Sequence, residues 1–247
     1  MISGEAVVFF IIISIGVIYV IRSYRKELKL SRRQKNFTLS VTHELKTPIA
    51  SSKLFLETLL NRDLPNDKQM EIIQKIYHDQ ERLQKLVENI LMTSQVAEED
   101  LKLLIEDVNV FDLVQKTCQD FPKTHTFINN IDKGLSIKVD RFYFTSVIQN
   151  LHENAQKYSD KGAEIIWSSN TEGDKKLISI MDQGSGIPES EKDKIFQLFY
   201  RLDMEETRTS KGTGLGLYLV DNIIKLHDGK INVENHENKG SIFTIKL

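Results

Sequence analysis

Hydrophobic and polar positions divide the chain into three regions with different patterns. Residues 6–21, AVVFFIIISIGVIYVI, form an unbroken uncharged run. From residue 36 to about residue 97, apolar residues recur every three or four positions, the period of amphipathic helices. Beyond residue 101, short apolar runs alternate with helical stretches, as in domains that combine helices with a sheet. We therefore expect an apolar N-terminal helix, a helical region and an α/β domain.

The uncharged run has the features of a membrane-spanning helix. As an ideal helix, residues 6–21 span roughly 24 Å, which is at the short end for a membrane helix. Basic residues follow at once: Arg22, Arg25, Lys26, Lys29, Arg32, Arg33 and Lys35. This bias places the C-terminal side in the cytoplasm and lets residues 22–35 contact anionic lipid. Residues 1–5 are then outside, too few for a folded sensor. A buried core helix is the alternative.

Residues 36–100 are expected to form two antiparallel helices joined by the turn-forming sequence NRDLPND at 61–67. The predicted buried stripe of the first helix comprises Val41, Leu45, Ile49, Ser52, Leu56 and Leu59. The predicted apolar face of the second helix, 68–97, comprises Ile73, Ile76, Tyr77, Leu83, Leu86, Val87, Ile90 and Leu91. Such narrow stripes bury too little surface in one hairpin. Two hairpins in a four-helix bundle solve this, so we expect a homodimer.

His43 lies about 200° round the first helix from Leu45, so it faces away from the buried stripe. An imidazole in water is largely uncharged at neutral pH and keeps a lone pair. The adjacent Glu44 can orient the ring and take its other proton. His43 is therefore a candidate nucleophile. The alternative is an ordinary solvated side chain.

The α/β region is expected to contain four helices and five strands. The predicted helices are 111–121, 140–159, 190–199 and 214–227. The predicted strands are 135–139, 163–169, 176–182, 229–235 and 241–247. The structure of residues 121–135 stays open.

Two asparagines stand out on the predicted helix 140–159. Asn150 and Asn154 are four residues apart and project from one face. Carboxamide oxygens suit Mg²⁺ that phosphates also hold. Lys157, one turn further on, can meet phosphate charge. The alternative is the polar face of an amphipathic helix.

A carboxylate and two glycines follow the predicted strand 176–182. Asp182 ends the strand, and Gly184 and Gly186 come next. A carboxylate there can accept the exocyclic amine of adenine, while glycines let the backbone approach the base. The same string also occurs as an ordinary connection between a strand and a turn.

The sequence KGTGLGLYLV carries a stronger phosphate signal. Gly212, Gly214 and Gly216 precede and enter a helix, where free amides and the positive helix end can cradle phosphates. No G-K-[ST] follows, so this is not a Walker P-loop. Upstream, the polar run 202–211 is expected to act as a mobile lid, with Arg201 and Arg208 as candidate phosphate cations. The expected apolar hook before it comprises Phe196, Phe199 and Tyr200.

Composition excludes several other classes. The chain has 247 residues, of which 40% are hydrophobic and 28% charged, as in globular proteins. A formal net charge of -2 gives no reason to expect a nucleic-acid partner. Cys118 is the only cysteine, which excludes an intramolecular disulfide and a cysteine-built metal cluster.

Taken together, the motifs resemble those of sensor histidine kinases of bacterial two-component systems. HELKTP resembles the H box. The asparagine, glycine and phenylalanine motifs follow in the order of the N box, first glycine box, F box and second glycine box of the Bergerat (GHKL) ATP-binding fold. The resemblance covers residues 36–247, and with the uncharged run 6–21 it leads us to expect a membrane-anchored protein with an N-terminal transmembrane helix. A helical hairpin (36–100) forming a dimeric four-helix bundle for dimerisation and phosphotransfer follows, and then an α/β sandwich (101–247) that binds ATP.

The resemblance also implies residue roles. His43 receives the γ-phosphate of ATP, Glu44 assists as base, and Thr47 places the water that dephosphorylates a partner regulator. Asn154 binds Mg²⁺ and Asp182 binds adenine. The other implied nucleotide contacts are Asn150, Lys157, Tyr158, Gly184, Gly186, Ile187, Arg201, Arg208, Gly212, Thr213, Gly214, Leu215, Gly216 and Leu217.

The implied cofactors are ATP and Mg²⁺, and the implied partner is the receiver domain of a separate response regulator. A separate membrane or cytosolic sensory partner is compatible with the short N-terminus. Two other classes share part of the pattern. One is a GHKL ATPase that drives a conformational cycle, as in the gyrase and mismatch-repair families. The other is a non-catalytic membrane scaffold.

Overall fold

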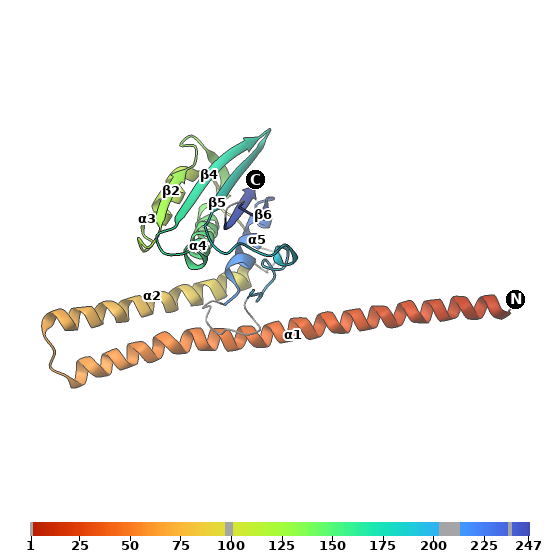
Figure 1. Cartoon of the computed structure of the whole chain (residues 1–247), viewed down its shortest axis with the longest axis horizontal. Helices are drawn as coiled ribbons and strands as arrows, with labels where there is room; N and C mark the ends of the chain where they lie inside the picture. Colours follow the sequence, from red (N-terminus) through yellow and green to blue (C-terminus); the bar gives the residue numbers. More distant parts are fainter. Residues whose placement is uncertain (1, 97–100, 203–212, 237–238) are drawn as a thin grey trace.

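A long helical hairpin carries an α/β domain on one side (Figure 1). The computed structural model describes residues 2–96, 101–202, 213–236 and 239–247. Helix α1 (Ile2–Asn61) is continuous through the predicted basic segment and the His43 segment. After a short turn, helix α2 (Asn66–Val96) runs back beside it. The predicted helical hairpin and the position of its turn are confirmed.

The apolar N-terminal part of α1 stands away from the α/β domain (Figure 1). Within the part of the chain that the structure describes, no helix combines the length and the apolar character needed to span a bilayer.

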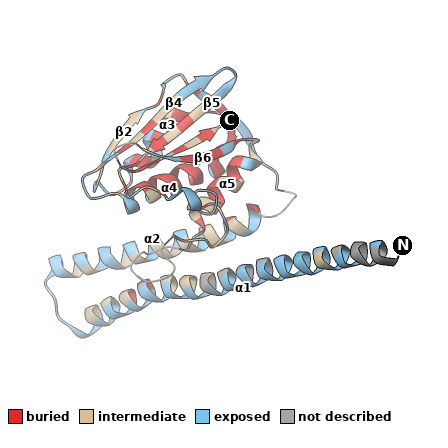
Figure 2. Ribbon diagram, turned by 45° about the vertical axis from the view of Figure 1, so that its right-hand side comes forward, coloured by how far each residue is buried: buried red, intermediate tan, exposed pale blue. Residues whose placement is uncertain are grey.

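The apolar stripes of the hairpin are only partly covered within one chain. Of the predicted α1 stripe, Ser52 is buried, while Ile49 and Leu56 are 54% and 49% exposed. On α2, Tyr77 and Leu91 are 61% and 57% exposed. Figure 2 shows the contrast between this largely exposed hairpin and the buried interior of the α/β domain. One hairpin cannot cover both of its helices, so full burial of the stripe stays a prediction for the dimer.

The α/β domain is built on a five-stranded sheet in the order β2-β4-β5-β7-β6. Its strands are β2 (Thr126–Asn130), β4 (Glu164–Glu172), β5 (Lys175–Met181), β6 (Lys230–Asn235) and β7 (Ser241–Lys246). Only β2 and β4 pair in parallel, and the other pairs are antiparallel. A separate antiparallel pair joins β1 (Ile105–Asn109) to β3 (Ser136–Asp140).

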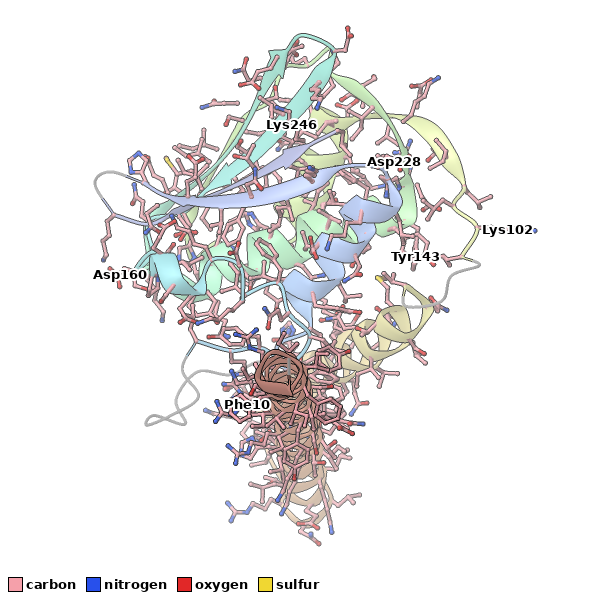
Figure 3. All side chains as sticks on the ribbon, turned by 90° about the vertical axis from the view of Figure 1, so that its right-hand side faces the viewer. Phe10, Lys102, Tyr143, Asp160, Asp228 and Lys246 are labelled. Carbon is pink, nitrogen blue, oxygen red and sulfur yellow. The ribbon has the colours of Figure 1, made fainter. Side chains whose placement is uncertain are left out.

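Three helices cover one face of the five-stranded sheet: α3 (Val110–Gln119), α4 (Arg141–Tyr158) and α5 (Gly216–Leu226). Trp167 and Ile245 from the sheet and Phe144 and Leu219 from the helices are fully buried between the layers. The C-terminal turns of α2 join this core through Met92, which is 8% exposed. The view along α1 shows the domain on one side of that helix, with Lys246 far from it (Figure 3). The expected α/β sandwich is confirmed.

Residues 190–199 do not form the predicted helix. Only a short 3₁₀ turn (Glu189–Glu191) is present, and a chain of turns follows. The turns bury Ile195 and leave Phe199 with a positive φ of 64°, which no helix can contain. The open segment 121–135 contains β2, which pairs with β4. Strand β1 was not predicted.

Candidate active site

A cavity of about 260 Å³ lies between α4, the start of α5 and the turn after β5. Most of the predicted nucleotide-contacting residues line it, although they come from segments far apart in the sequence. The predicted residues at its wall are Asn150, Asn154, Lys157, Tyr158, Asp182, Gly186, Ile187, Arg201, Thr213, Gly214, Gly216 and Leu217.

Asp182 is held rigidly at one end of this cavity. Its side chain is 5% exposed, and its Oδ1 accepts hydrogen bonds from the backbone N–H of Gly184 (2.8 Å) and of Ser241 (3.1 Å). Burial raises the pKa of the Asp182 carboxyl, and the two backbone hydrogen bonds oppose that shift. Among the described residues, no donor reaches Oδ2. That oxygen can accept a hydrogen bond from the exocyclic amine of a base.

Gly184 and Gly186 shape the turn that follows. A Cβ on Gly184 would lie 2.7 Å from the carbonyl oxygen of Tyr158. Gly184 does not line the cavity and acts by donating its N–H to Asp182. Gly186 has a φ of +75°, which favours glycine.

Asn235 clamps this turn, a role that the sequence analysis missed. Its Oδ1 accepts from the N–H of Ile187 (2.8 Å), and its Nδ2 donates to the carbonyl of Ile187 (2.9 Å). Ile187 is thereby fixed against the cavity wall. Asn235 ends β6, and only the pairing of strands brings it to the turn.

The other end of the cavity is the opening of α5. No side chain among the described residues caps this helix, so its first amides are available to an anion. The Nδ2 of Asn150 donates to Ser146, to the carbonyl at 2.9 Å and to the hydroxyl at 3.2 Å. Its Oδ1 therefore points toward Gly216, where a Cβ would come within 2.7 Å. Gly216 lets α5 approach Asn150 closely.

Asn154, Lys157 and Tyr158 border the cavity along α4. Asn154 is half-buried, while Lys157 and Tyr158 are exposed. The Nζ of Lys157 donates to the Tyr158 hydroxyl (3.0 Å) and lies 4.6 Å from the centroid of the Tyr158 ring. The ammonium is thus held beside the cavity wall, where it can meet a phosphate.

Besides Gly184, three of the predicted nucleotide contacts differ from expectation or cannot be placed. Leu215 is fully buried and does not line the cavity, so it belongs to the core. Arg208 and Gly212 lie outside the described residues, as does most of the expected lid. Cavity residues that the sequence analysis did not assign to it are Asn89, Glu153, Ser185, Ile195, Tyr200, Leu202, Ser241 and Phe243. Of these, Glu153 could have been suspected from its place beside Asn154.

The second part of the site is the middle of α1. His43 is exposed, as predicted. Glu44 is only 14% exposed in its side chain and is ion-paired with Arg82 of α2. Arg82 thus fixes the carboxylate on the side of α1 that faces α2, a contact that the sequence did not reveal. The Thr47 hydroxyl donates to the His43 carbonyl (3.1 Å).

Two family models match the two structural regions. "His Kinase A (phospho-acceptor) domain" matches residues 33–99. "Histidine kinase-, DNA gyrase B-, and HSP90-like ATPase" matches residues 139–247. The matches agree with the boundary between the hairpin and the α/β domain.

Curated relatives are similar to nearly the whole chain. Sensor histidine kinase WalK of Bacillus subtilis is 30% identical over 94% of this chain and 39% of its own length. Alginate biosynthesis sensor protein KinB of Pseudomonas aeruginosa is 31% identical over 95% of this chain and 40% of its own length. The chain therefore spans about two fifths of the length of these relatives.

Solved structures show the same architecture. Acinetobacter baumannii histidine kinase AdeS matches with a TM-score of 0.62 and 26% identity, over 83% of this chain and 96% of that one. Histidine kinase ThkA in complex with response regulator protein TrrA matches with a TM-score of 0.61 and 27% identity, over 91% of this chain and 65% of that one.

Proposed function

Because the chain belongs to the sensor histidine kinases of two-component systems, we propose that it phosphorylates its own His43 from ATP and passes the phosphoryl group to an aspartate of a separate response regulator. The observation that carries this proposal is the cavity. Asp182 stands at one end of it, where its Oδ2 can accept the amine of adenine, and the start of α5, which no described side chain caps, stands at the other, where backbone amides can hold phosphates.

The chemistry is a phosphoryl transfer in which positioning and charge neutralisation do most of the catalysis. A nitrogen of the His43 ring forms a bond to the γ-phosphorus as the bond to the bridging β–γ oxygen breaks, and ADP leaves. Glu44 is proposed to take the proton from the other ring nitrogen, which requires its carboxylate to turn from Arg82 toward the His43 ring. The amides of α5 and Lys157 neutralise phosphate charge.

Retention of label distinguishes this function from that of an ATPase. The full-length chain, incubated with γ-labelled ATP, is expected to take up acid-labile, alkali-stable label. His43→Gln is expected to take up none while binding ATP as before. Acid-labile label on the His43→Gln chain, or release of free phosphate with no labelled protein, contradicts the proposal.

We propose that Mg²⁺ enters with the nucleotide. Among the described residues, no group of three or more His, Cys, Asp or Glu side chains can hold a metal. The carboxamide of Asn154 is a neutral oxygen donor at the cavity wall, which fits an ion held mainly by phosphates. The bound ion would supply charge neutralisation. Asn154→Ala is expected to lose most of the Mg²⁺ dependence of ATP affinity, whereas Glu153→Gln is expected to keep it. Equal Mg²⁺ dependence in Asn154→Ala and the wild type would remove Asn154 from this role.

We also propose that the partner is a receiver domain. The similar histidine kinase ThkA, solved in complex with response regulator protein TrrA, supports this proposal. Labelled protein mixed with receiver domains from the same genome is expected to lose label from His43 to one of them. A receiver with its acceptor aspartate changed to asparagine is the control, and transfer to that control contradicts an aspartyl acceptor. Thr47 is proposed to place the water that dephosphorylates the response regulator. Thr47→Ala is therefore expected to leave the labelling of His43 intact and to prolong the life of the phosphorylated regulator.

We further propose that residues 6–21 anchor the protein in the cell membrane, with residues 1–5 outside and the α/β domain in the cytoplasm. The uncharged run and the basic residues after it support this topology. Phe9, Phe10 and Ile15 on this part of α1 are 68%, 72% and 62% exposed, so apolar surface is available to lipid. The full chain is expected to stay in the membrane pellet after an alkaline wash, and a chain lacking residues 1–21 is expected to be in the supernatant. A full chain that washes off contradicts the anchor.

The orientation has its own test. Cys118 is buried, so a Cys118→Ala background removes the one native thiol without placing a polar group in the core. In that background Gly4→Cys is expected to react in intact cells with a thiol reagent that cannot cross the membrane. Reaction only after cell lysis would reverse the proposed orientation.

A further inference from the structure

The α/β domain contacts α1 one helical turn before His43. The ring of Phe37 stacks on that of Phe199, with centroids 4.0 Å apart and an interplanar angle of 23°. The Nη1 of Arg201 donates to the hydroxyl of Ser40 at 3.4 Å. Phe37 and Ser40 are three residues apart and therefore lie on the same side of α1. The contacts join residues of one chain that are about 160 positions apart.

His43 stands next to this contact. It follows Ser40 by three residues, which places it about 60° round the helix and about 4.5 Å further along the axis. Its side chain is exposed, so the docked domain leaves the ring accessible. The segment that carries Arg201 also lines the nucleotide cavity. Arg201, a residue of the cavity wall, therefore contacts α1 about one turn before the acceptor His43.

Phe199 links this contact to the phosphate end of the cavity. Its φ of 64° is unusual for a bulky residue and persists only where surrounding contacts hold it. The N–H of Phe199 donates to the carbonyl of Gly214 (3.2 Å), and a Cβ on Gly214 would lie 3.0 Å from the Phe199 carbonyl carbon. One side of Phe199 therefore touches α1 and the other touches the second glycine motif.

The second helix of the same hairpin also reaches the cavity. Asn89 of α2 lines it, and α2 packs against α5. Met92, one turn further on, is buried in the core of the α/β domain. Both helices of one hairpin therefore hold the α/β domain of their own chain.

We propose that Phe37 and Ser40 form a docking surface for the α/β domain of the same chain, and that His43 is phosphorylated in cis within each subunit of the dimer. This inference rests on the proposed function. The bond changes are those of the autophosphorylation step given above, with ATP and His43 on one polypeptide.

Mixed dimers test the direction of transfer. A wild-type chain and an Asp182→Asn chain, each in full length with its own tag, are co-expressed and purified through both tags. With γ-labelled ATP, transfer in cis labels the wild-type chain alone. Transfer in trans labels the Asp182→Asn chain alone and overturns the inference. A second mixed dimer carries Asn154→Ala in place of Asp182→Asn. It gives the same test with a variant whose changed residue is not buried.

The wild-type homodimer separates the cis assignment from the proposed function. Label on the homodimer together with label on the Asp182→Asn chain of the mixed dimer keeps the proposed function and overturns the cis assignment. A homodimer that takes up no label overturns both.

The docking surface has a matched pair of variants. Phe37→Leu keeps an apolar side chain but loses the stacked ring, and it is expected to slow His43 labelling about tenfold while ATP affinity stays within about twofold. Phe55, on the same helix, lies near Lys75 rather than the α/β domain, with Nζ 5.8 Å from the ring centroid. Phe55→Leu is expected to label at the wild-type rate. Unchanged or faster labelling by Phe37→Leu overturns the docking surface.

Discussion

The α/β domain and the helical hairpin differ in how completely one chain can bury its apolar residues. In the domain, large side chains such as Trp167, Phe144 and Ile148 are fully enclosed between sheet and helices. In the hairpin, Leu60, Leu54 and Tyr77 are 83%, 62% and 61% exposed. Burial of apolar surface is the main favourable term in folding. The domain is thus complete in one chain, whereas the hairpin needs a further apolar surface.

This difference separates two roles. The domain must hold the nucleotide with fixed geometry, and a closed core keeps Asp182 and the start of α5 in place. In the proposed function the hairpin presents His43 to the domain and then to a response regulator, which requires an open surface. The homodimer that we expect would cover the remaining stripes of α1 and α2 and leave His43, on another face, in solvent.

Two phenylalanines on α4 differ in burial and test whether the core of the domain is closed. Phe144 is fully buried and Phe142 is 64% exposed. Phe144→Ala is expected to lower the free energy of unfolding of the domain by about 3–5 kcal/mol, because it leaves a cavity in a closed core. Phe142→Ala is expected to change it by less than about 0.5 kcal/mol. Denaturant unfolding followed by the fluorescence of Trp167 measures both free energies. Equal losses of stability in the two variants would contradict the burial of Phe144 and the exposure of Phe142.

The next largest expected effect is a loss of stability of the α/β domain at low pH. His152 is 1% exposed, its Nδ1 accepts a hydrogen bond from the Trp167 indole at 3.4 Å, and its ring packs on Phe121 with centroids 4.7 Å apart. Burial, with a smaller contribution from His125, lowers the pKa of His152 to about 4. The unfolded chain therefore binds more protons than the folded one between about pH 6.5 and pH 4.

The expected result is that stability is full above about pH 6.5 and falls by about 3 kcal/mol as the pH falls to about 4. Asp182, whose pKa burial raises, titrates in the opposite sense, so the pH profile of the wild type alone is not decisive. The measurement is the difference between the wild type and His152→Phe in denaturant unfolding from pH 7 to pH 4. A difference that does not depend on pH would show that His152 is not buried in its neutral form.

The smallest of the three effects concerns the hairpin. Leu56 lies on the α1 stripe and is half-exposed, and a glutamate there would place an unpaired charge in a four-helix interface. Leu56→Glu is expected to weaken the dimer roughly thirtyfold, about 2 kcal/mol. ATP affinity is expected to stay unchanged, because the cavity belongs to the other region. Sedimentation velocity over a range of concentrations measures the dimer.

Lys53→Glu is the matched control for the hairpin. Its side chain is 76% exposed and forms only a surface pair with Glu57 at 3.8 Å. This variant is expected to dimerise like the wild type. Equal weakening by both variants would argue for a general charge effect rather than a buried stripe at Leu56.

Much of the fold could be predicted from the sequence because its helices and strands have strong periodicity. The helices that carry His43 and Asn154 and the strand that ends at Asp182 follow from local patterns. The segment 190–199 could not be predicted in the same way. Its helical spacing is overridden by the burial of Ile195 and the contact of Phe199 with α1, and both depend on residues far away in the sequence.

The residues of the candidate site also fall into two groups, those predicted from local sequence and those brought together only by packing. The residue types and their spacing identified the asparagines, glycines and aspartate, because that chemistry is local. Asn235, Arg82 and Asn89 were missed, since each reaches the site from another strand or helix and carries no local signal. Leu215 was assigned to the nucleotide because it lies within a glycine motif, but it is fully buried and does not line the cavity.

By itself, the sequence determined the order of helices α1–α5 and strands β3–β7, the exposure of His43 and most of the residues that line the cavity along α4 and the start of α5. Only the tertiary structure decided that Asn235 clamps Ile187, that Arg82 holds Glu44, and that Phe199 stacks on Phe37. The physical reason is that helical and strand periodicity depend on neighbours within a few residues. The relative position of nucleotide and histidine depends on side chains that only packing brings together.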